Sequence, residues 1–291
     1  MDPDHTSKKW PELNVSWVSG DLMDLVILDD YVASHDFIIH AAGKISYKAS
    51  ERKELISSNF TLTQQLVDAA IFHNIKGFVF ISSTAALSRD KEKEPISESG
   101  IWQNMKDASD YSRSKWMAEL EVWRAKEEGL NVLILAPSVI LGRGSVEKGF
   151  NQIIQKIKKG HSYFPSGAGG FVDVRDVASF CTDAAAAGLW GEKYILNAAN
   201  LTFKEAYSKV ASIAKVKIPS KPVPVFLTRI LISLNAFLQL GSKNKNSLLT
   251  HEALKLACSS FEYNNQKSIK TGVIQYRPID ESFQWAVEGV G

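Results

Sequence analysis

The chain has 291 residues, of which 45% are hydrophobic and 23% are charged, and its formal net charge at pH 7 is +2. A chain of this length and composition can bury a sizeable core and form one large or two small globular domains. The near balance of charges gives no electrostatic case for a nucleic-acid partner, and the polar first residues exclude a secretory signal peptide. Cys181 and Cys258 are isolated, so we expect free thiols and a cytoplasmic protein.

Apolar runs of strand length alternate with helical patterns through the first two thirds of the chain. The first expected strand spans residues 15–18, and the second, 36–40, is almost entirely apolar, as a strand buried on both faces should be. Later strands are expected at 77–81, 132–135 and 193–196, and helices at 59–73, 109–128, 150–159, 175–187 and 204–214, with another helix starting at Pro278. This alternation predicts an α/β fold, a parallel sheet with helices on both faces.

The last third of the chain is richer in helical patterns and predicts a smaller C-terminal lobe. Its most apolar stretch, 223–240, has Pro224 near its start, contains Arg229 and is a little short for a membrane-spanning helix. We therefore expect no membrane span and a helix packed within this lobe. A helix lying on a membrane surface is the alternative.

Tyr111 and Lys115 form the sharpest chemical motif of the sequence. They lie four residues apart at the start of an expected helix and so share one face of it. A free tyrosine has a pKa of about 10. A neighbouring lysine ammonium favours the phenolate and lowers that pKa, so the pair could exchange a proton with a substrate oxygen near neutral pH. Two ordinary side chains on a helix surface are the alternative.

Three hydroxyl side chains follow the expected strand 77–81, namely Ser82, Ser83 and Thr84. Ligands of open α/β sheets bind at the carboxyl ends of the strands. A hydroxyl here could hold a substrate carbonyl oxygen while Tyr111 protonates it. Turn or capping chemistry is the simpler alternative, and the presence of Tyr111 favours the catalytic interpretation.

The order and spacing of these segments resemble the extended short-chain dehydrogenase/reductase superfamily, also called the NAD-dependent epimerase/dehydratase family, over almost the whole chain. The segments that carry the resemblance are 20–22, 40–43, Asn59, 82–85, 111–115 with Glu119, 136–142 and 171–178. Residues 119–131 are most similar to dihydroflavonol-reductase-like and 3β-hydroxysteroid-dehydrogenase-like members. Ala136 stands where many members carry Arg and Leu141 where many carry Tyr, so the substrate is left open.

The resemblance implies a Rossmann-like fold, NAD or NADP as the cofactor, and three catalytic residues. Tyr111 would be the general acid/base, Lys115 would lower its pKa and bind the ribose, and Thr84 would orient the reacting oxygen. The implied cofactor-binding residues are Asp21, Leu22, Ala41, Ala42, Gly43, Asn59, Ser82, Tyr111, Lys115, Pro137, Ser138 and Val139. Residues 1–160, with 171–200 interleaved, would form the NAD(P)-binding domain, and residues 201–291 would mainly form the substrate lobe.

The implied activity is hydride transfer to or from the carbonyl or secondary alcohol carbon of a small molecule, by a possible homodimer. Two alternatives stay open. Nucleotide-sugar epimerases and dehydratases use the same three catalytic residues, and a non-catalytic Rossmann-like binding protein or inactive fragment could keep the fold without turnover.

The family's opening unit, a strand, a GxxGxxG turn and a helix, has no counterpart here. Backbone N–H groups of such a turn hold a dinucleotide pyrophosphate. The expected strand 15–18 corresponds to the family's third strand, so we expect strand 36–40 to have an open edge. The favoured explanation is a fragment of a longer reading frame; a degenerate protein and a chain completed by another polypeptide are the others.

The remaining polar candidates have structural interpretations. We expect His40 to be a packed histidine. Asp173 and Asp176 should act as a helix N-cap and as first-turn support, and not as a catalytic carboxylate pair. The histidines show no metal-ligand spacing, so we expect no metal site.

Overall fold

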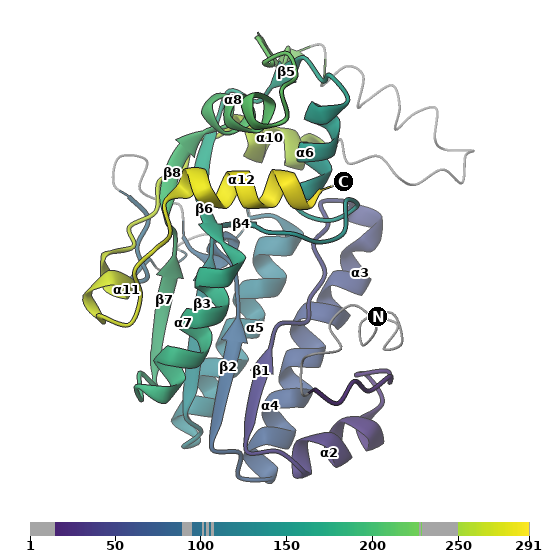
Figure 1. The fold of residues 1–291 in the computed structure, drawn as a ribbon. Coiled ribbons are helices and arrows are strands. Elements are labelled where there is room, and N and C mark those ends of the chain that lie inside the picture. Colours follow the sequence, from purple (N-terminus) through teal and green to yellow (C-terminus); the bar gives the residue numbers. More distant parts are fainter. Residues whose placement is uncertain are drawn as a thin grey trace.

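The computed structural model describes residues 15–88, 95–100, 102, 105, 108–226, 228 and 250–290. Its centre is a four-stranded parallel sheet with the strand order β1-β2-β3-β7. The strands are β1 (Phe37–His40), β2 (Gly77–Ile81), β3 (Val132–Pro137) and β7 (Glu192–Leu196). All four were expected from the sequence within two residues, and the parallel sheet confirms the expected fold class (Figure 1).

Helices cover both faces of this sheet because alternate strand residues point to opposite sides. On one face, Phe78 and Phe80 pack with Ile134 against α2 (Leu25–Ala33), α4 (Leu62–Phe72) and α5 (Asp110–Glu127). On the other face, Val79 and Leu133 pack against α7 (Val174–Ala186). The middle strands are therefore buried on both sides, which explains why their sequences are apolar without interruption.

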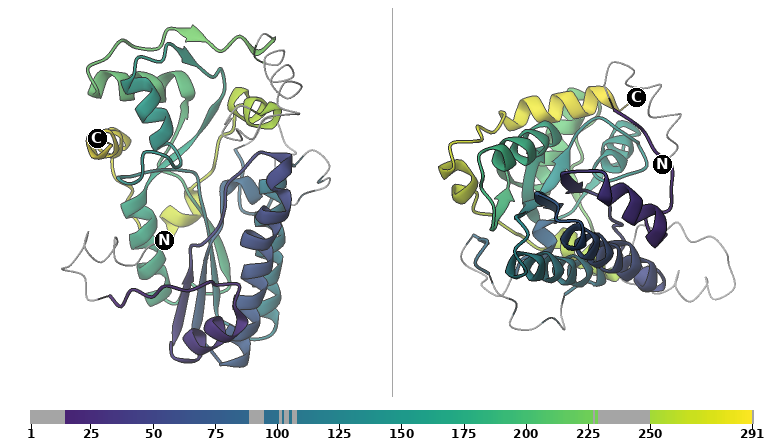
Figure 2. Two further views of the ribbon diagram at one scale, coloured as in Figure 1. Left: turned by 90° about the vertical axis from the view of Figure 1, so that its right-hand side faces the viewer. Right: turned by 90° about the horizontal axis from the view of Figure 1, so that it is seen from below.

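A second lobe lies beyond the carboxyl ends of the strands (Figures 1 and 2). It contains a three-stranded sheet with the order β4-β6-β8, made of β4 (Val139–Leu141), β6 (Ala168–Asp173) and β8 (Ala199–Thr202). A short pair, β5 (Tyr163–Phe164) and β9 (Lys221–Pro222), lies at its edge. Its own apolar core is shared by α6 (Asn151–Lys158), α8 (Phe203–Ile213) and α12 (Ile279–Gly289). The remaining helices of this part are α10 (His251–Cys258) and α11 (Gln266–Lys270).

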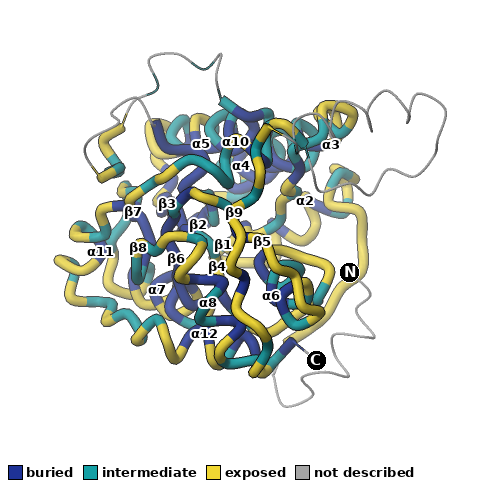
Figure 3. Tube along the Cα trace, turned by 90° about the horizontal axis from the view of Figure 1, so that it is seen from above, coloured by how far each residue is buried: buried dark blue, intermediate teal, exposed yellow. Residues whose placement is uncertain are grey.

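Residues 15–18 do not form the expected strand. They lie outside the sheet, and Val15, Trp17 and Val18 are exposed (Figure 3). The reason is that β1 hydrogen-bonds only to β2 within the described part of the chain, so no strand is present to pair with this segment. The open edge expected for β1 is confirmed, and Phe37 and Ile39 on it are each 55% exposed.

The helix expected at 59–73 starts earlier than its sequence pattern indicated. A helical path runs from the 3-10 turn Ala49–Glu51 through α3 (Arg52–Leu55) and a π-helical segment, Ile56–Thr61, into α4. A π-segment inside a helix is uncommon and often occurs at functional sites. Helix α2, which begins at the cap Asp24, was not predicted from the sequence; it has only nine residues, and Asp29 and Asp30 interrupt its apolar side chains.

Asp173 and Asp176 at the start of α7 take two different structural roles. Asp173 caps the helix by accepting a hydrogen bond from the Arg175 backbone N–H at 2.8 Å, which confirms the expected cap. Asp176 lies in the first turn, but it binds the backbone and side chain of Arg277. It thereby ties α7 to the segment that leads into α12.

No helix in the described ranges has both the length and the apolar character needed to cross a bilayer. Most of the apolar stretch 223–240, together with residues 89–94, lies outside those ranges.

Candidate active site

A cavity of about 550 Å³ lies between the carboxyl ends of β1, β2 and β3 and the second lobe. Nearly all the residues predicted to form the site line this cavity. They are Ala41, Ala42, Gly43, Asn59, Ser82, Thr84, Tyr111, Lys115, Pro137, Ser138 and Val139. The fold thus brings together five segments that are far apart in the sequence.

Asp21 and Leu22 are not among the residues that line the cavity. Asp21 accepts a hydrogen bond from the Met23 backbone N–H at 2.9 Å and forms a turn before α2, and Leu22 is exposed. They lie elsewhere because the preceding segment, 15–18, is not part of the sheet. The structure therefore does not bring these two predicted cofactor-binding residues to the site.

The start of α5 places Tyr111 and Lys115 in the cavity wall. Ser109 caps the helix by accepting a hydrogen bond from the Ser112 backbone N–H at 2.8 Å. Tyr111 is 8% exposed and packs edge-on against Tyr47, with 6.2 Å between the ring centroids. Lys115 is 4% exposed, and its Nζ donates to the Ile81 carbonyl oxygen at 2.8 Å. Both side chains are therefore fixed by protein contacts before any ligand binds.

The pKa of Tyr111 moves in the opposite direction from that expected from the sequence. Burial raises it, and a hydrogen bond with the Ser83 side chain opposes the rise. Lys115 does not counteract it because the ammonium is directed to the Ile81 carbonyl and lies over the Phe80 ring, 4.2 Å from its centroid. A phenol that stays protonated at neutral pH is a proton donor, which suits the protonation of a substrate oxygen.

Burial also lowers the pKa of Lys115, to about 8, and the negative charge of Glu119 opposes this fall. An ammonium is costly to bury, so its retained charge depends on the Ile81 carbonyl and on Glu119. At pH 7 the ammonium is still the main form of Lys115, and it contributes a positive charge to the inner end of the cavity.

The three hydroxyl residues after β2 have different environments. Ser82 donates a hydrogen bond to Glu119 Oε1 at 2.5 Å. Ser83 caps a short 3-10 turn, Thr84–Ala86, and also bonds Tyr111. Thr84 is buried and lines the cavity. Sequence reasoning did not identify the contact between Ser83 and Tyr111, because it depends on how the strand end meets the helix.

Asn59 lies in the π-segment and supports the turn that follows β1. Its Oδ1 accepts from the Lys44 backbone N–H at 2.7 Å, and its Nδ2 donates to the Lys44 carbonyl at 2.9 Å and to Ser114 Oγ at 2.8 Å. A Cβ atom on Gly43 would be 3.1 Å from Asn59 Oδ1, so the glycine allows this close approach. Asn59 thus positions the 41–44 turn, and its contact with a cofactor stays a prediction.

Ser138 offers an unused polar group in the cavity wall. It is 8% exposed, and its Oγ has no hydrogen-bond partner among the described residues. A buried hydroxyl without a partner carries a desolvation cost, which a ligand with a polar group could relieve. Together with Lys115 and the 41–44 turn, Ser138 gives the inner part of the cavity a small set of polar contacts.

The outer part of the cavity is apolar. It is lined by side chains of the second lobe, namely Ile140, Phe150, Ile153, Phe203, Leu256 and Phe261. The only charged residues among the described lining residues are Lys44 and Lys115. Lys44 is paired with two carboxylates, at 3.0 Å from Glu51 and 2.5 Å from Glu54. This part of the cavity therefore suits an apolar group better than a phosphate.

His40 at the end of β1 is buried beside the site and is packed, as expected. Its Nε2 bonds Thr63 Oγ1 at 2.9 Å, and its ring stacks on Phe80. Burial, with a smaller contribution from the charge of Lys115, lowers the pKa of His40 to about 3. The imidazole is therefore neutral near pH 7 and acts as a structural side chain.

We expect His40 to make the protein sensitive to acid. Between pH 6.5 and pH 3 the unfolded chain binds a proton at this position that the folded chain does not bind, so stability is lost as the pH falls. The loss should be about 2 kcal/mol between pH 6.5 and pH 5. Urea unfolding of the wild type, His40→Asn and the exposed-site control His35→Asn at both pH values measures it. An unchanged pH dependence in His40→Asn would contradict this assignment.

The chain is similar to known proteins in sequence and in fold. The model of a family described as "NAD dependent epimerase/dehydratase family" matches residues 1–197. A putative dihydroflavonol 4-reductase from Synechocystis sp. is 27% identical over 222 residues, which cover 74% of this chain and 64% of that protein. The chain thus spans less than two thirds of the length of this curated relative.

Two solved structures show the same fold. The crystal structure of gox2253 has a TM-score of 0.81 at 24% identity, covering 97% of this chain and 86% of that one. The structure of a UDP-glucuronic acid 4-epimerase from Bacillus cereus in complex with NAD has a TM-score of 0.74 at 12% identity, covering 99% of this chain and 82% of that one.

Proposed function

Because the chain belongs to the NAD-dependent epimerase/dehydratase family, we propose that it catalyses hydride transfer between NAD or NADP and the carbonyl or alcohol carbon of a bulky apolar substrate. The observation that carries this proposal is one cavity in which Tyr111, Lys115 and Thr84 meet an apolar outer wall. Reduction of a carbonyl is the favoured direction, because the buried phenol of Tyr111 is protonated at neutral pH and can donate its proton.

The proposed roles follow from the environment of each side chain. Tyr111 gives its phenolic proton to the substrate oxygen as negative charge develops there. The Thr84 hydroxyl donates a hydrogen bond to the same oxygen and holds it in place. The Ser83 side chain, hydrogen-bonded to Tyr111, stabilises the phenolate left on Tyr111. The Lys115 ammonium, fixed by the Ile81 carbonyl, supplies a positive charge at the inner end of the cavity. The lining of the cavity excludes water from these groups.

The inner part of the cavity fits the nicotinamide and ribose end of the cofactor. The buried Ser138 hydroxyl lacks a partner among the described residues, and Ala41, Ala42 and Gly43 line the cavity with small residues. Lys115 and Ser138 would hold ribose or amide oxygens there. When bound, the cofactor supplies the hydride, and the protein supplies position and electrostatics. Asp21 and Leu22, proposed from sequence for the adenine end, do not line the described cavity.

An assay that compares two substrate classes tests this proposal. The purified chain is mixed with NADH or NADPH and a panel of aryl ketones and aldehydes, and consumption of the reduced cofactor is followed by absorbance. In parallel it is mixed with NAD⁺ or NADP⁺ and UDP- or dTDP-sugars, and the sugar products are analysed by chromatography. We expect consumption only with the aryl carbonyl compounds. Conversion of a nucleotide sugar without net cofactor consumption would support the epimerase alternative instead.

Thermal unfolding with each cofactor tests the binding step separately. A ligand that binds only the folded chain raises its apparent stability by mass action. We expect the unfolding temperature to rise with NADH or NADPH. A folded chain with neither a rise nor any turnover would be the non-catalytic protein considered from the sequence.

Three further features are part of the proposal. Residues 1–160, with 171–200 interleaved, would form the cofactor domain, and 201–291 would mainly form the substrate lobe. A cytoplasmic location is supported by the two free cysteines, Cys181 and Cys258. A homodimer through α4 and α5 is supported by the exposed apolar side chains of Phe72 and Leu120 on those helices.

A further inference from the structure

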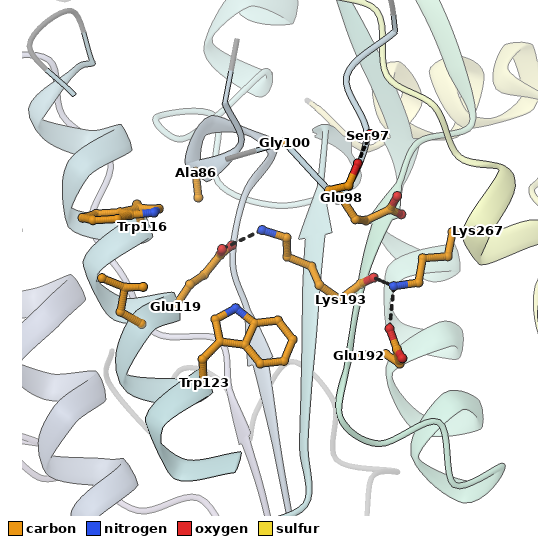
Figure 4. A pocket seen from close by; sticks show the side chains of 12 residues that line it. Ala86, Ser97, Glu98, Gly100, Trp116, Glu119, Trp123, Glu192, Lys193 and Lys267 are labelled. Atoms are coloured by element: carbon orange, nitrogen blue, oxygen red, sulfur yellow. Dashed lines mark hydrogen bonds and ion pairs between the residues drawn. The ribbon is translucent and has the colours of Figure 1, made fainter. Parts of the chain in front are cut away.

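Behind the proposed site, the structure contains a buried ion pair between two secondary-structure elements. Glu119 on α5 is 2% exposed, and its Oε2 lies 2.8 Å from Nζ of Lys193 on β7. The pair lines a second cavity of about 540 Å³, between Trp116 and Trp123 of α5 and the strand β7 (Figure 4). This cavity is separate from the one that contains Tyr111.

The second oxygen of Glu119 connects this ion pair to the proposed site. Glu119 Oε1 accepts the hydrogen bond from Ser82 Oγ at 2.5 Å, and Ser82 lines the first cavity. One helical turn earlier, Lys115 Nζ donates to the Ile81 carbonyl. Two side chains on one face of α5 therefore hold two successive residues at the end of β2. The position of α5 relative to the Ser82–Thr84 segment depends on both contacts.

A buried ion pair is weak evidence for stability, because removing two charges from water costs about as much as their attraction returns. Here the ion pair supplies a carboxylate, and the described residues that line the first cavity include none. Among the described residues, the titratable groups that line the first cavity with Lys115 are Lys44 and the tyrosines Tyr47, Tyr111 and Tyr263, and His40, whose pKa is about 3, lies beside it. None of these is a carboxylate, and the negative charge that acts on Lys115 is that of Glu119.

We propose that Glu119 is a positioning residue of the active site, which holds Lys115 in its charged, Ile81-bound state and holds Ser82 beside it, with Lys193 as its counter-ion. This inference depends on the proposed function in one respect only, namely that Lys115 has a role in the active site. The Lys193 ammonium binds one oxygen of the Glu119 carboxylate and leaves the other oxygen to accept from Ser82, and the negative charge of Glu119 favours the charged form of Lys115.

The ionisation of Lys115 can be measured directly by NMR on the full chain with isotope-labelled lysine. The Lys115 signal is identified by its absence from Lys115→Arg, and its titration is followed from pH 6 to pH 10 without cofactor or substrate. Burial lowers the pKa of Lys115 to about 8 in the wild type. We expect Glu119→Gln to lower the midpoint by about one pH unit or more, because the ammonium loses its nearby anion.

A matched control and a second variant make the result decisive. Glu121 lies on the same helix and pairs with Arg124 at 3.0 Å, so Glu121→Gln removes a carboxylate without touching Ser82 and should leave the midpoint unchanged. If Glu119→Gln does not fold because Lys193 is left unpaired, Glu119→Gln with Lys193→Gln removes both charges, and a smaller fall in the same direction is expected, because the loss of the nearby positive charge offsets part of the effect. A folded variant of either kind whose Lys115 midpoint equals that of the wild type would overturn the proposal. A lowered midpoint without any hydride transfer would leave this inference standing and reject the proposed function.

Discussion

Replacing Tyr111 with phenylalanine is expected to lower kcat for carbonyl reduction by a factor of about 10² to 10⁴. The variant loses the phenolic proton that protonates the substrate oxygen. The fold should persist, because the ring of residue 111 still packs with Leu55 and Ala85 and remains edge-on to Tyr47. Steady-state rates with an aryl carbonyl substrate and either reduced cofactor measure the loss, and thermal unfolding confirms that the variant is folded.

Tyr47→Phe is the matched control for this variant. Tyr47 lines the same cavity and touches the ring of Tyr111, so its hydroxyl tests whether any phenol in the cavity is enough. We expect its kcat to change by much less than that of Tyr111→Phe, while cofactor binding stays intact in both. Equal rates for Tyr111→Phe and the wild type would remove Tyr111 from the mechanism and reject the assigned proton donor.

The parallel sheet could be predicted from the sequence because its strands are buried on both faces. Uninterrupted apolar runs such as Val132–Pro137 have few other stable solutions in a globular chain, and the helices between them have recognisable caps, such as Ser109 and Asp173. The strands of the second lobe were not predicted. β4 and β8 are only three and four residues long, and short strands carry too little periodic pattern to be distinguished from loops.

The prediction of a strand at residues 15–18 was wrong for a different physical reason. A strand exists only where a neighbouring strand supplies hydrogen bonds. In the strand order of this fold the third strand pairs with the second, and the described sheet has no strand beyond β1 to take that place. The sequence pattern of the segment is that of a strand, but the pairing is a tertiary property. The same cause removes Asp21 and Leu22 from the cavity, since they follow directly after this segment.

The candidate site was largely predictable as a set of residues but not as an electrostatic environment. Tyr111 and Lys115 are four residues apart, and that spacing alone suggested that the lysine lowers the pKa of the tyrosine. In the structure, the Ile81 carbonyl holds the ammonium, and burial dominates the pKa of both groups. Burial, and the link from Glu119 to Lys193 on a distant strand, arise only when the elements are packed together.

The junction between the second lobe and the site should depend on Gly167. A Cβ atom there would lie 2.2 Å from the Ser259 carbonyl oxygen and 2.6 Å from that of Ala257. Both atoms belong to the backbone, so rotation of a side chain cannot relieve the clash, and the end of α10 with the residues that follow it must move. We expect Gly167→Ala to lower the free energy of unfolding by about 3 kcal/mol.

Gly169→Ala is the matched comparison, because it makes the same chemical change two residues away. Its Cβ would lie 3.6 Å from Cζ of Phe203, an ordinary contact, so we expect a change in the free energy of unfolding of less than about 1 kcal/mol. Urea unfolding of both variants measures this difference, and equal losses would contradict the assigned clash.

The two variants should also differ in substrate binding, apart from their difference in stability. Leu256, Ala257 and Phe261 belong to the segment that Gly167→Ala displaces, and they line the outer part of the cavity. We therefore expect this variant, under conditions where it is still folded, to raise KM for an apolar carbonyl substrate more than Gly169→Ala does. Such a result would place substrate recognition in the contact between the two lobes, whereas the proton donor stays on α5 beneath it.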